Sequence, residues 1–134
     1  MLEYYKSLPD YISTSRLKEL FEELVTKIKL QAFSVEEALE ALLELSDRQW
    51  HAYELLDNNL KNEIENWILS NWNKESINDV EFISSIIGRL GLTKAYKYMK
   101  SLLNENLRNE IRSVIEEAIA DLDGHVEDPY FGMK

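Results

Sequence analysis

Hydrophobic residues recur every three or four positions along most of the chain, which is the period of an amphipathic α-helix. The clearest example is residues 15–33, where six apolar side chains fall on one stripe. Similar stripes predict helices over 34–46, 46–57, 58–72, 79–91, 93–103 and 106–124. Every periodic segment follows the helical period, so we expect an all-α fold of about seven helices. Helices should account for more than about 65% of the residues.

Capping signals define where several of these helices begin. Ser34 and Ser46 each start the Ser-x-x-Glu/Gln pattern of a capping box. Asp79 and Thr93 are placed to cap two later helices, and Gly124 can end the last one. These signals predict that one helix ends at Ser46 and that another begins there.

Two segments of the chain resemble each other at an offset of 47 residues. Residues 55–64 and 102–111 are identical at seven of ten positions, several of them polar. The weaker match around this block suggests two units of three helices each, at about 34–72 and 81–118. If the units are equivalent, Leu60 should match Leu107 in burial, and Ile64 should match Ile111. Chance similarity between two amphipathic helices is the alternative.

A helical unit repeated near this period resembles the HEAT and armadillo repeat families. In those families, helical units stack their apolar faces on one another. The resemblance implies a right-handed superhelix or a compact bundle.

The composition suggests a single domain spanning residues 1–134. That length is typical of one domain, and only 4 Gly and 2 Pro favour long helices over many short strands. The chain has no cysteine, which excludes disulfides and thiolate metal sites. Met1 to Asp10 has Glu3 and two tyrosines where a signal peptide needs basic and then apolar residues. No stretch approaches the roughly 20 apolar residues of a membrane span, so we expect a cytoplasmic protein that does not bind membranes.

Charge is the strongest functional signal in the sequence. The formal net charge is -10 and the pI about 4.7, which disfavours binding to nucleic acids and anionic membranes. Residues 34–66 hold nine acids and two bases, whereas residues 82–104 hold four bases and no acid. Glu36, Glu40 and Glu44 recur every four residues and should form an acidic ridge facing solvent. A merely solvated helix face would produce the same pattern.

Catalytic and metal-binding motifs are absent from the sequence, so we expect no enzymatic activity, no cofactor and no metal. His51 has no second ligand at helical spacing except Asp47. His125 lies in the acid-rich segment 121–128, which resembles half of a calcium loop but lacks its later ligands. Whether that segment binds a metal stays open at this stage. Residues 94–100 interleave lysines with tyrosines, as single-strand-binding proteins do, but the strong net negative charge of the chain disfavours that role. Docking of this segment against the acidic ridge of a second copy is an alternative at least as good.

These features together resemble the small, acidic, helical immunity proteins that neutralise bacterial toxins. The resemblance implies an inhibitor that masks a basic protein partner by steric and electrostatic occlusion. A helical-repeat scaffold or adaptor without inhibitory activity is the alternative. Trp72 and Tyr130, with Trp50 and Tyr53, are candidate aromatic anchors for the partner. Tyr130 and Phe131 should also hold the C-terminal tail against a protein surface. The predicted partner-binding residues are Glu36, Glu37, Glu40, Glu44, Asp47, Trp50 and Tyr53.

Overall fold

The computed structural model describes residues 2–131 and contains only helices as regular elements. Helix accounts for 71% of these residues, and none of them lies in a strand. The all-α prediction with seven α-helices is therefore confirmed. The elements are α1 (Leu2–Lys6), α2 (Thr14–Lys29), α3 (Val35–His51), α4 (Asn58–Asn71), α5 (Ile77–Leu90), α6 (Thr93–Ser101), the 3-10 helix η1 (Leu102–Asn104) and α7 (Asn109–Leu122).

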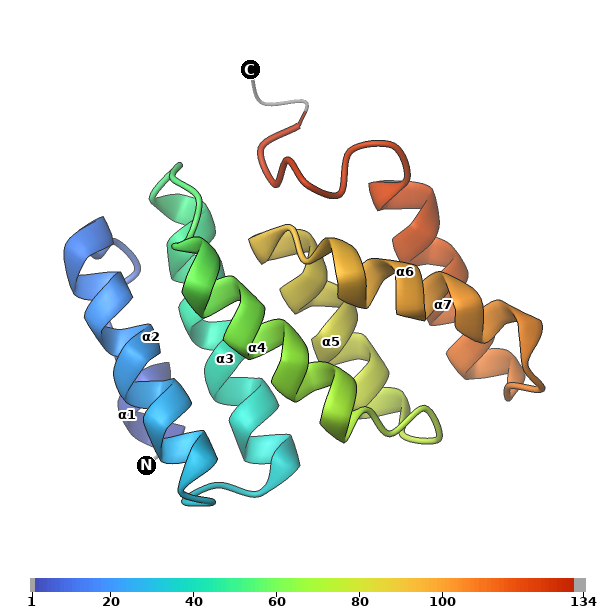
Figure 1. The fold of residues 1–134 in the computed structure, drawn as a ribbon, viewed down its shortest axis with the longest axis horizontal. Coiled ribbons are helices and arrows are strands. Elements are labelled where there is room, and N and C mark those ends of the chain that lie inside the picture. Colours follow the sequence, from blue (N-terminus) through green and yellow to red (C-terminus); the bar gives the residue numbers. More distant parts are fainter. Residues whose placement is uncertain (1, 132–134) are drawn as a thin grey trace.

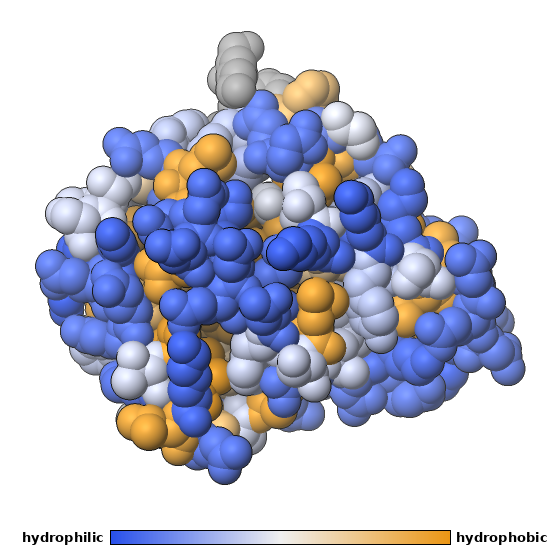
Figure 2. Space-filling view, viewed as in Figure 1, coloured by the Kyte–Doolittle hydropathy of each residue, from blue (hydrophilic) through white to orange (hydrophobic). Residues whose placement is uncertain are grey.

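The helices form two layers that enclose one hydrophobic core (Figure 1). Helices α1, α3, α5 and α7 lie side by side in the first layer, and α2, α4 and α6 form the second. The layers meet through α2 on α3 and through α6 on both α5 and α7. The apolar stripes of all the helices except α1 point between the layers into one cluster of buried side chains, which Tyr5 of α1 joins. Figure 2 shows that hydrophilic side chains cover most of the visible face, with small separate hydrophobic patches.

The seven helices are not the seven that the sequence pattern predicts. Helix α1 lies before the first predicted helix, and the helices predicted over 34–46 and 46–57 are one continuous helix, α3. Ser46 does not cap a helix. It is fully buried within α3, and its hydroxyl donates a hydrogen bond to the Leu42 carbonyl at 2.6 Å. The capping-box pattern at Ser46 therefore lies inside α3, and its serine bonds to the preceding helical turn instead of capping a new helix.

Ser34 caps α3 as predicted, with both hydrogen bonds of the capping box formed. The N-cap of α5, however, is Ser76 rather than Asp79. Helix α6 has no cap from its own segment, because its N-cap residue is Leu92. Instead the buried carboxylate of Glu65, from α4, accepts a hydrogen bond from the Ala95 amide at 2.9 Å. This long-range cap connects α4 to α6.

The two proposed three-helix units do not match in structure. Ile64 and Ile111 are both buried as predicted, but Leu60 is buried in α4 whereas Leu107 is half-buried and precedes α7. Helix α4 packs in the second layer and α7 in the first. The prediction of equal burial at Leu60 and Leu107 is wrong, and the repeat units at 34–72 and 81–118 are not confirmed.

The Glu65 cap leads to a stability prediction. Glu65→Ala removes the acceptor for the Ala95 amide, so we expect it to reduce the free energy of unfolding by about 1–3 kcal/mol. Glu65→Gln keeps an acceptor oxygen at the same position and should lose clearly less. Urea unfolding followed by circular dichroism measures both values. Equal losses in the two variants would show that the hydrogen bond to Ala95 does not stabilise α6.

Candidate partner-binding surface

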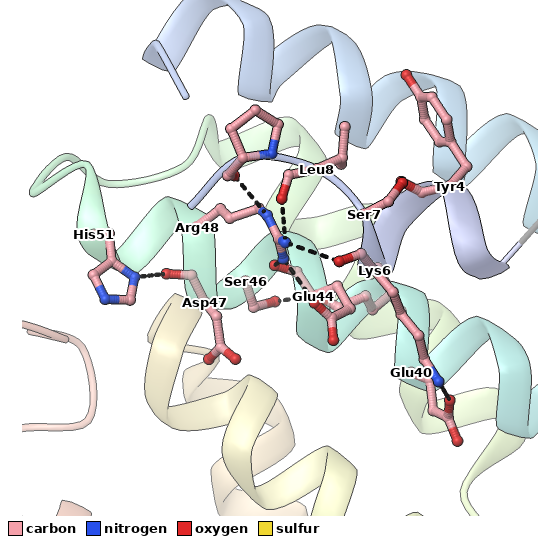
Figure 3. Close-up of polar contacts among 12 residues, drawn as sticks. Tyr4, Lys6, Ser7, Leu8, Glu40, Glu44, Ser46, Asp47, Arg48 and His51 are labelled. Carbon is pink, nitrogen blue, oxygen red and sulfur yellow. Dashed lines mark hydrogen bonds and ion pairs between the residues drawn. The ribbon is translucent and has the colours of Figure 1, made fainter. Parts of the chain in front are cut away.

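The predicted acidic ridge on α3 is largely neutralised within the protein (Figure 3). Glu36 is exposed, but Glu40 and Glu44 are half-buried. Glu40 forms an ion pair with Lys6 at 3.6 Å, and Glu44 forms one with Arg48 at 2.7 Å. The prediction that all three ridge glutamates face solvent is therefore wrong. Helix α1, which the sequence pattern did not predict, supplies Lys6.

Two other predicted binding residues also have partners within the chain. Glu37 accepts the Ser34 hydrogen bonds of the capping box. Asp47 accepts a hydrogen bond from Arg89 Nε at 2.9 Å, which ties α3 to α5. Both carboxylates act in the fold, so they offer a partner less charge than the sequence suggests.

Arg48 is the centre of the polar contacts in Figure 3. Its side chain is only 7% exposed. The guanidinium donates hydrogen bonds to the backbone carbonyls of Leu8 at 2.7 Å and Pro9 at 2.9 Å, and to both the carbonyl and the carboxylate of Glu44. It also reaches the Lys6 carbonyl at 3.5 Å. Arg48 therefore holds the connection between α1 and α2 against α3.

Trp50 and Tyr53, the two aromatic residues predicted to bind a partner, lie together where α3 ends. Tyr130 stacks on both rings, with centroid distances of 6.3 Å to Trp50 and 5.5 Å to Tyr53. The Tyr130 hydroxyl donates to the carbonyls of Gln49 and Glu54, and the Trp50 indole donates to the Pro129 carbonyl. This arrangement confirms that the C-terminal tail is docked, over the part up to Phe131 that the structure describes. Tyr130 is a buried anchor of the fold, and burial raises the pKa of its hydroxyl.

Several aromatic rings around this anchor are exposed. Tyr53 is 61% exposed and has a φ of 57°, a left-handed backbone conformation that residues other than glycine seldom adopt. Tyr11 is 78% exposed and packs edge-on against His51, and Phe131 is 61% exposed and stacks on His125. We call Tyr11, Trp50, His51, Tyr53 and Phe131 the aromatic end. Of these residues, the sequence assigned only Trp50 and Tyr53 to partner binding. It predicted Phe131 as an anchor of the tail, but the ring is largely exposed, and Tyr11 reaches this site through a contact distant in sequence.

Trp72 differs from these residues. It is half-buried, it packs edge-on against Tyr98 at 5.0 Å, and its indole nitrogen is buried without a hydrogen-bond acceptor among residues 2–131. Trp72 therefore belongs to the interior packing.

The basic and aromatic side chains of residues 94–100 are only partly separated. Lys94 and Lys97 are exposed, whereas Tyr96 is buried and Tyr98 is half-buried. Lys100 is different, because its ammonium lies 5.6 Å from the centroid of the Tyr96 ring.

Charge is divided between the two layers of helices. Helices α2, α4 and α6 carry eight basic and five acidic residues, whereas α1, α3, α5 and α7 carry four basic and twelve acidic residues. The first layer is therefore strongly acidic, and the second is weakly basic. We call the outer surface of α3, α5 and α7 the acidic layer.

Within the acid-rich segment 121–128, Asp123 is engaged in contacts with other parts of the chain. Asp123 accepts hydrogen bonds from the Tyr96 hydroxyl at 2.7 Å and from Lys100 at 3.0 Å, and these contacts lower the pKa of its carboxyl group. Burial and the contact with Asp123 raise the pKa of the Tyr96 hydroxyl. Within residues 2–131, no three His, Asp or Glu side chains are grouped as a metal site would require. None of the described helices is long and apolar enough to cross a membrane.

The Arg48 contacts predict a large and specific loss of stability. Arg48→Met removes the donor to the Leu8 and Pro9 carbonyls and leaves the half-buried Glu44 carboxylate without its ion pair, so we expect the free energy of unfolding to fall by about 3 kcal/mol. Arg89→Met removes an exposed ion pair with Asp47 and should cost less than about 1 kcal/mol. Urea unfolding compares the two variants. Similar losses would mean that Arg48 does not hold the α1–α2 connection.

Asp79 predicts a pH dependence of stability. Its side chain is 4% exposed, and one carboxylate oxygen is buried without a hydrogen bond among residues 2–131. Burial, with a smaller effect from Glu36, raises its pKa above the ordinary 3.8, while the contact with Ser76 opposes the shift. The folded state then holds this proton more tightly than the unfolded state, so stability should fall as the pH rises from 3.8 through the folded pKa.

Asp79→Asn removes the titrating group, so at neutral pH this variant should be more stable than the wild-type protein and should lack that part of the pH dependence. Unfolding in urea across this pH range measures the difference. If the two pH profiles run parallel, Asp79 does not contribute to the pH dependence.

Comparison with known proteins adds no assignment to these observations. The chain matches no protein-family model, no curated protein and no solved structure. The candidate surface for a partner therefore rests on the geometry of this chain alone: an acidic layer that borders the aromatic end.

Proposed function

We propose that the protein is a non-catalytic inhibitor that masks a basic protein partner with its acidic layer, as immunity proteins mask bacterial toxins. The observation that carries the proposal is the division of charge between the two helix layers. Twelve of the acidic residues belong to α1, α3, α5 and α7, which together have only four bases. A surface with this concentration of one charge accelerates the encounter with a partner of opposite charge.

The neighbouring aromatic end supplies the other part of a binding surface. Exposed Tyr, Trp and Phe side chains dominate the energetic centres of protein interfaces, whereas charges at the rim mainly set the association rate. Trp50 and Tyr53 are held in place by the buried Tyr130 ring, so little side-chain entropy is lost when they are covered. In this proposal the acidic layer steers the partner, and the aromatic end contributes affinity.

A scaffold or adaptor module is the second candidate. The separation of the acidic layer from the weakly basic surface of α2, α4 and α6 favours it, because two unlike surfaces can hold two different partners. The candidates differ in one measurable result. An inhibitor abolishes the partner's activity on binding, whereas an adaptor leaves it intact.

The proposal predicts salt-dependent association with a basic protein. The partner is purified from the native host by affinity to this chain and identified, and its association rate is then measured over a series of salt concentrations. The rate should fall as salt rises, because the screening length decreases from about 10 Å at 0.1 M to about 3 Å at 1 M. The partner's own activity is assayed with and without this protein.

Matched charge reversals identify the surface involved. Glu36→Lys with Glu116→Lys changes two exposed acids of the acidic layer and should slow association, whereas Glu22→Lys with Glu75→Lys changes two exposed acids outside this layer and should have a smaller effect. An association rate that is independent of salt, or an equal effect of both pairs, contradicts steering by the acidic layer. An active partner within the complex would favour the adaptor over the inhibitor.

A further inference from the structure

A groove of about 660 Å³ lies on the acidic layer between α5 and α7. Its floor is made by small or apolar residues that recur every three or four positions along both helices: Ser84, Ser85, Gly88, Val114, Ala118 and Leu122. One end of the groove reaches the aromatic end at Trp50 and Phe131, next to Pro129 of the docked tail.

We infer that this groove holds an α-helix of the partner, which presents Lys or Arg to the groove's rim and small or apolar residues to its floor. The inference rests on the proposed function, because it names the part of the acidic layer where the basic partner binds. Two observations support this occupant: the negative charge of the groove, and the packing of α6 against the same pair of helices.

The rim of the groove is acidic and uncompensated. Glu81 from α5, and Glu117 and Asp121 from α7, line it. All three are exposed, and none forms an ion pair among residues 2–131. Glu117 and Asp121 are four residues apart on one helix, a like-charge spacing that slightly destabilises α7. A cationic side chain laid along the rim would relieve that repulsion.

Among residues 2–131, the one base that lines the groove is already neutralised. The Arg89 side chain donates to Asp47, and its guanidinium lies 5.1 Å from the Trp50 ring centroid. Its charge is therefore shared with the carboxylate and the indole at the aromatic end. The groove keeps a net negative charge that complements a basic helix.

The α5–α7 pair already accepts a helix on its opposite side. Helix α6 packs against both α5 and α7 from the second layer, through its buried residues Ala95, Tyr96 and Met99. The groove is the corresponding open side of the same pair. A partner helix laid in the groove would pack on this open side as α6 packs on the other.

The small residues of the floor permit a close approach. A Cβ built on Gly88 would lie 3.4 Å from Leu122 Cδ2, which is ordinary contact, so the backbone does not require this glycine. Gly88 has no side chain, and Ser84, Ser85 and Ala118 have short ones, so the backbone of another helix can pack close to α5 and α7. Val114 and Leu122 provide apolar contact area.

A designed peptide tests the groove directly. The probe is a fluorescein-labelled, alanine-rich helical peptide about as long as α5, with arginines flanking an alanine stripe. Binding to the full chain is measured by fluorescence anisotropy, and the contacted residues are located by shifts in backbone amide NMR signals. We expect saturable binding, with the largest shifts on the facing sides of α5 and α7. No saturable binding, or shifts centred elsewhere, would overturn the inference.

Matched variants separate the groove from the general charge of its layer. Glu81→Lys, Glu117→Lys and Asp121→Lys together should weaken peptide binding by about tenfold or more. The control triple Glu36→Lys, Glu110→Lys and Glu116→Lys makes the same change of charge on exposed residues of the same layer outside the groove, and it should weaken binding clearly less. Thermal unfolding verifies that both triples are folded. Equal weakening by the two triples counts against the groove.

A variant that changes shape without changing charge provides an independent readout. Ser85→Trp places a large ring in the groove and should abolish peptide binding, whereas Ser113→Trp, at an exposed position of α7 outside the groove, should not. Binding that tolerates Ser85→Trp would overturn the inference.

The same groove variants are then measured with the natural partner. If its association stays salt-dependent but ignores the groove variants, the groove is wrong and the proposed function stands. If its association is also independent of salt, both fail.

Discussion

Burial of α3 within the first layer is the constraint on which the rest of the structure depends. The helix packs against α1, α2 and α5, and its C-terminal half buries polar residues as well as leucines. A buried guanidinium or amide must have hydrogen-bond partners, because an unpaired polar group in the interior costs about 1–3 kcal/mol. Arg48 finds its partners in the α1–α2 connection, and Gln49 finds one in the Glu54 carbonyl. The requirement brings the N-terminal segment onto α3.

The same part of α3 also anchors the C-terminal tail. The Tyr130 hydroxyl bonds to the Gln49 carbonyl, and the Trp50 indole bonds to the Pro129 carbonyl. Segments from both ends of the chain thus meet at the end of one helix. The aromatic end is a consequence of this meeting, because Tyr11 arrives with the first segment and Phe131 with the second.

Local patterns were sufficient to predict the helical class and much of the core, because helical periodicity and burial are two expressions of the same amphipathic stripe. They failed where a partner distant in sequence determined the outcome. Ser46 looked like a helix cap, yet α3 continues through it because its neighbours are covered by α1 and α5. The Glu40–Glu44 surface looked free, yet Lys6 and Arg48 neutralise it. The internal similarity was also misleading, since matching stripes place α4 and α7 in different layers.

The sequence correctly indicated that charge is unevenly distributed, but it did not indicate where the acidic and basic surfaces lie in space. Blocks of acids and bases along the chain indicated that one segment is acidic and another basic. Successive long helices alternate between the two layers, however, so the charge is divided between the layers rather than between segments of the chain. On α3 every acid except Glu36 pairs with a base or caps the helix, whereas Glu81, Glu117 and Asp121 beside the α5–α7 groove are exposed. The four-residue spacing of Glu117 and Asp121 slightly destabilises α7. Charges that add nothing to the stability of α7, beside a groove with a small-residue floor, are the observation from which we infer a basic helical partner.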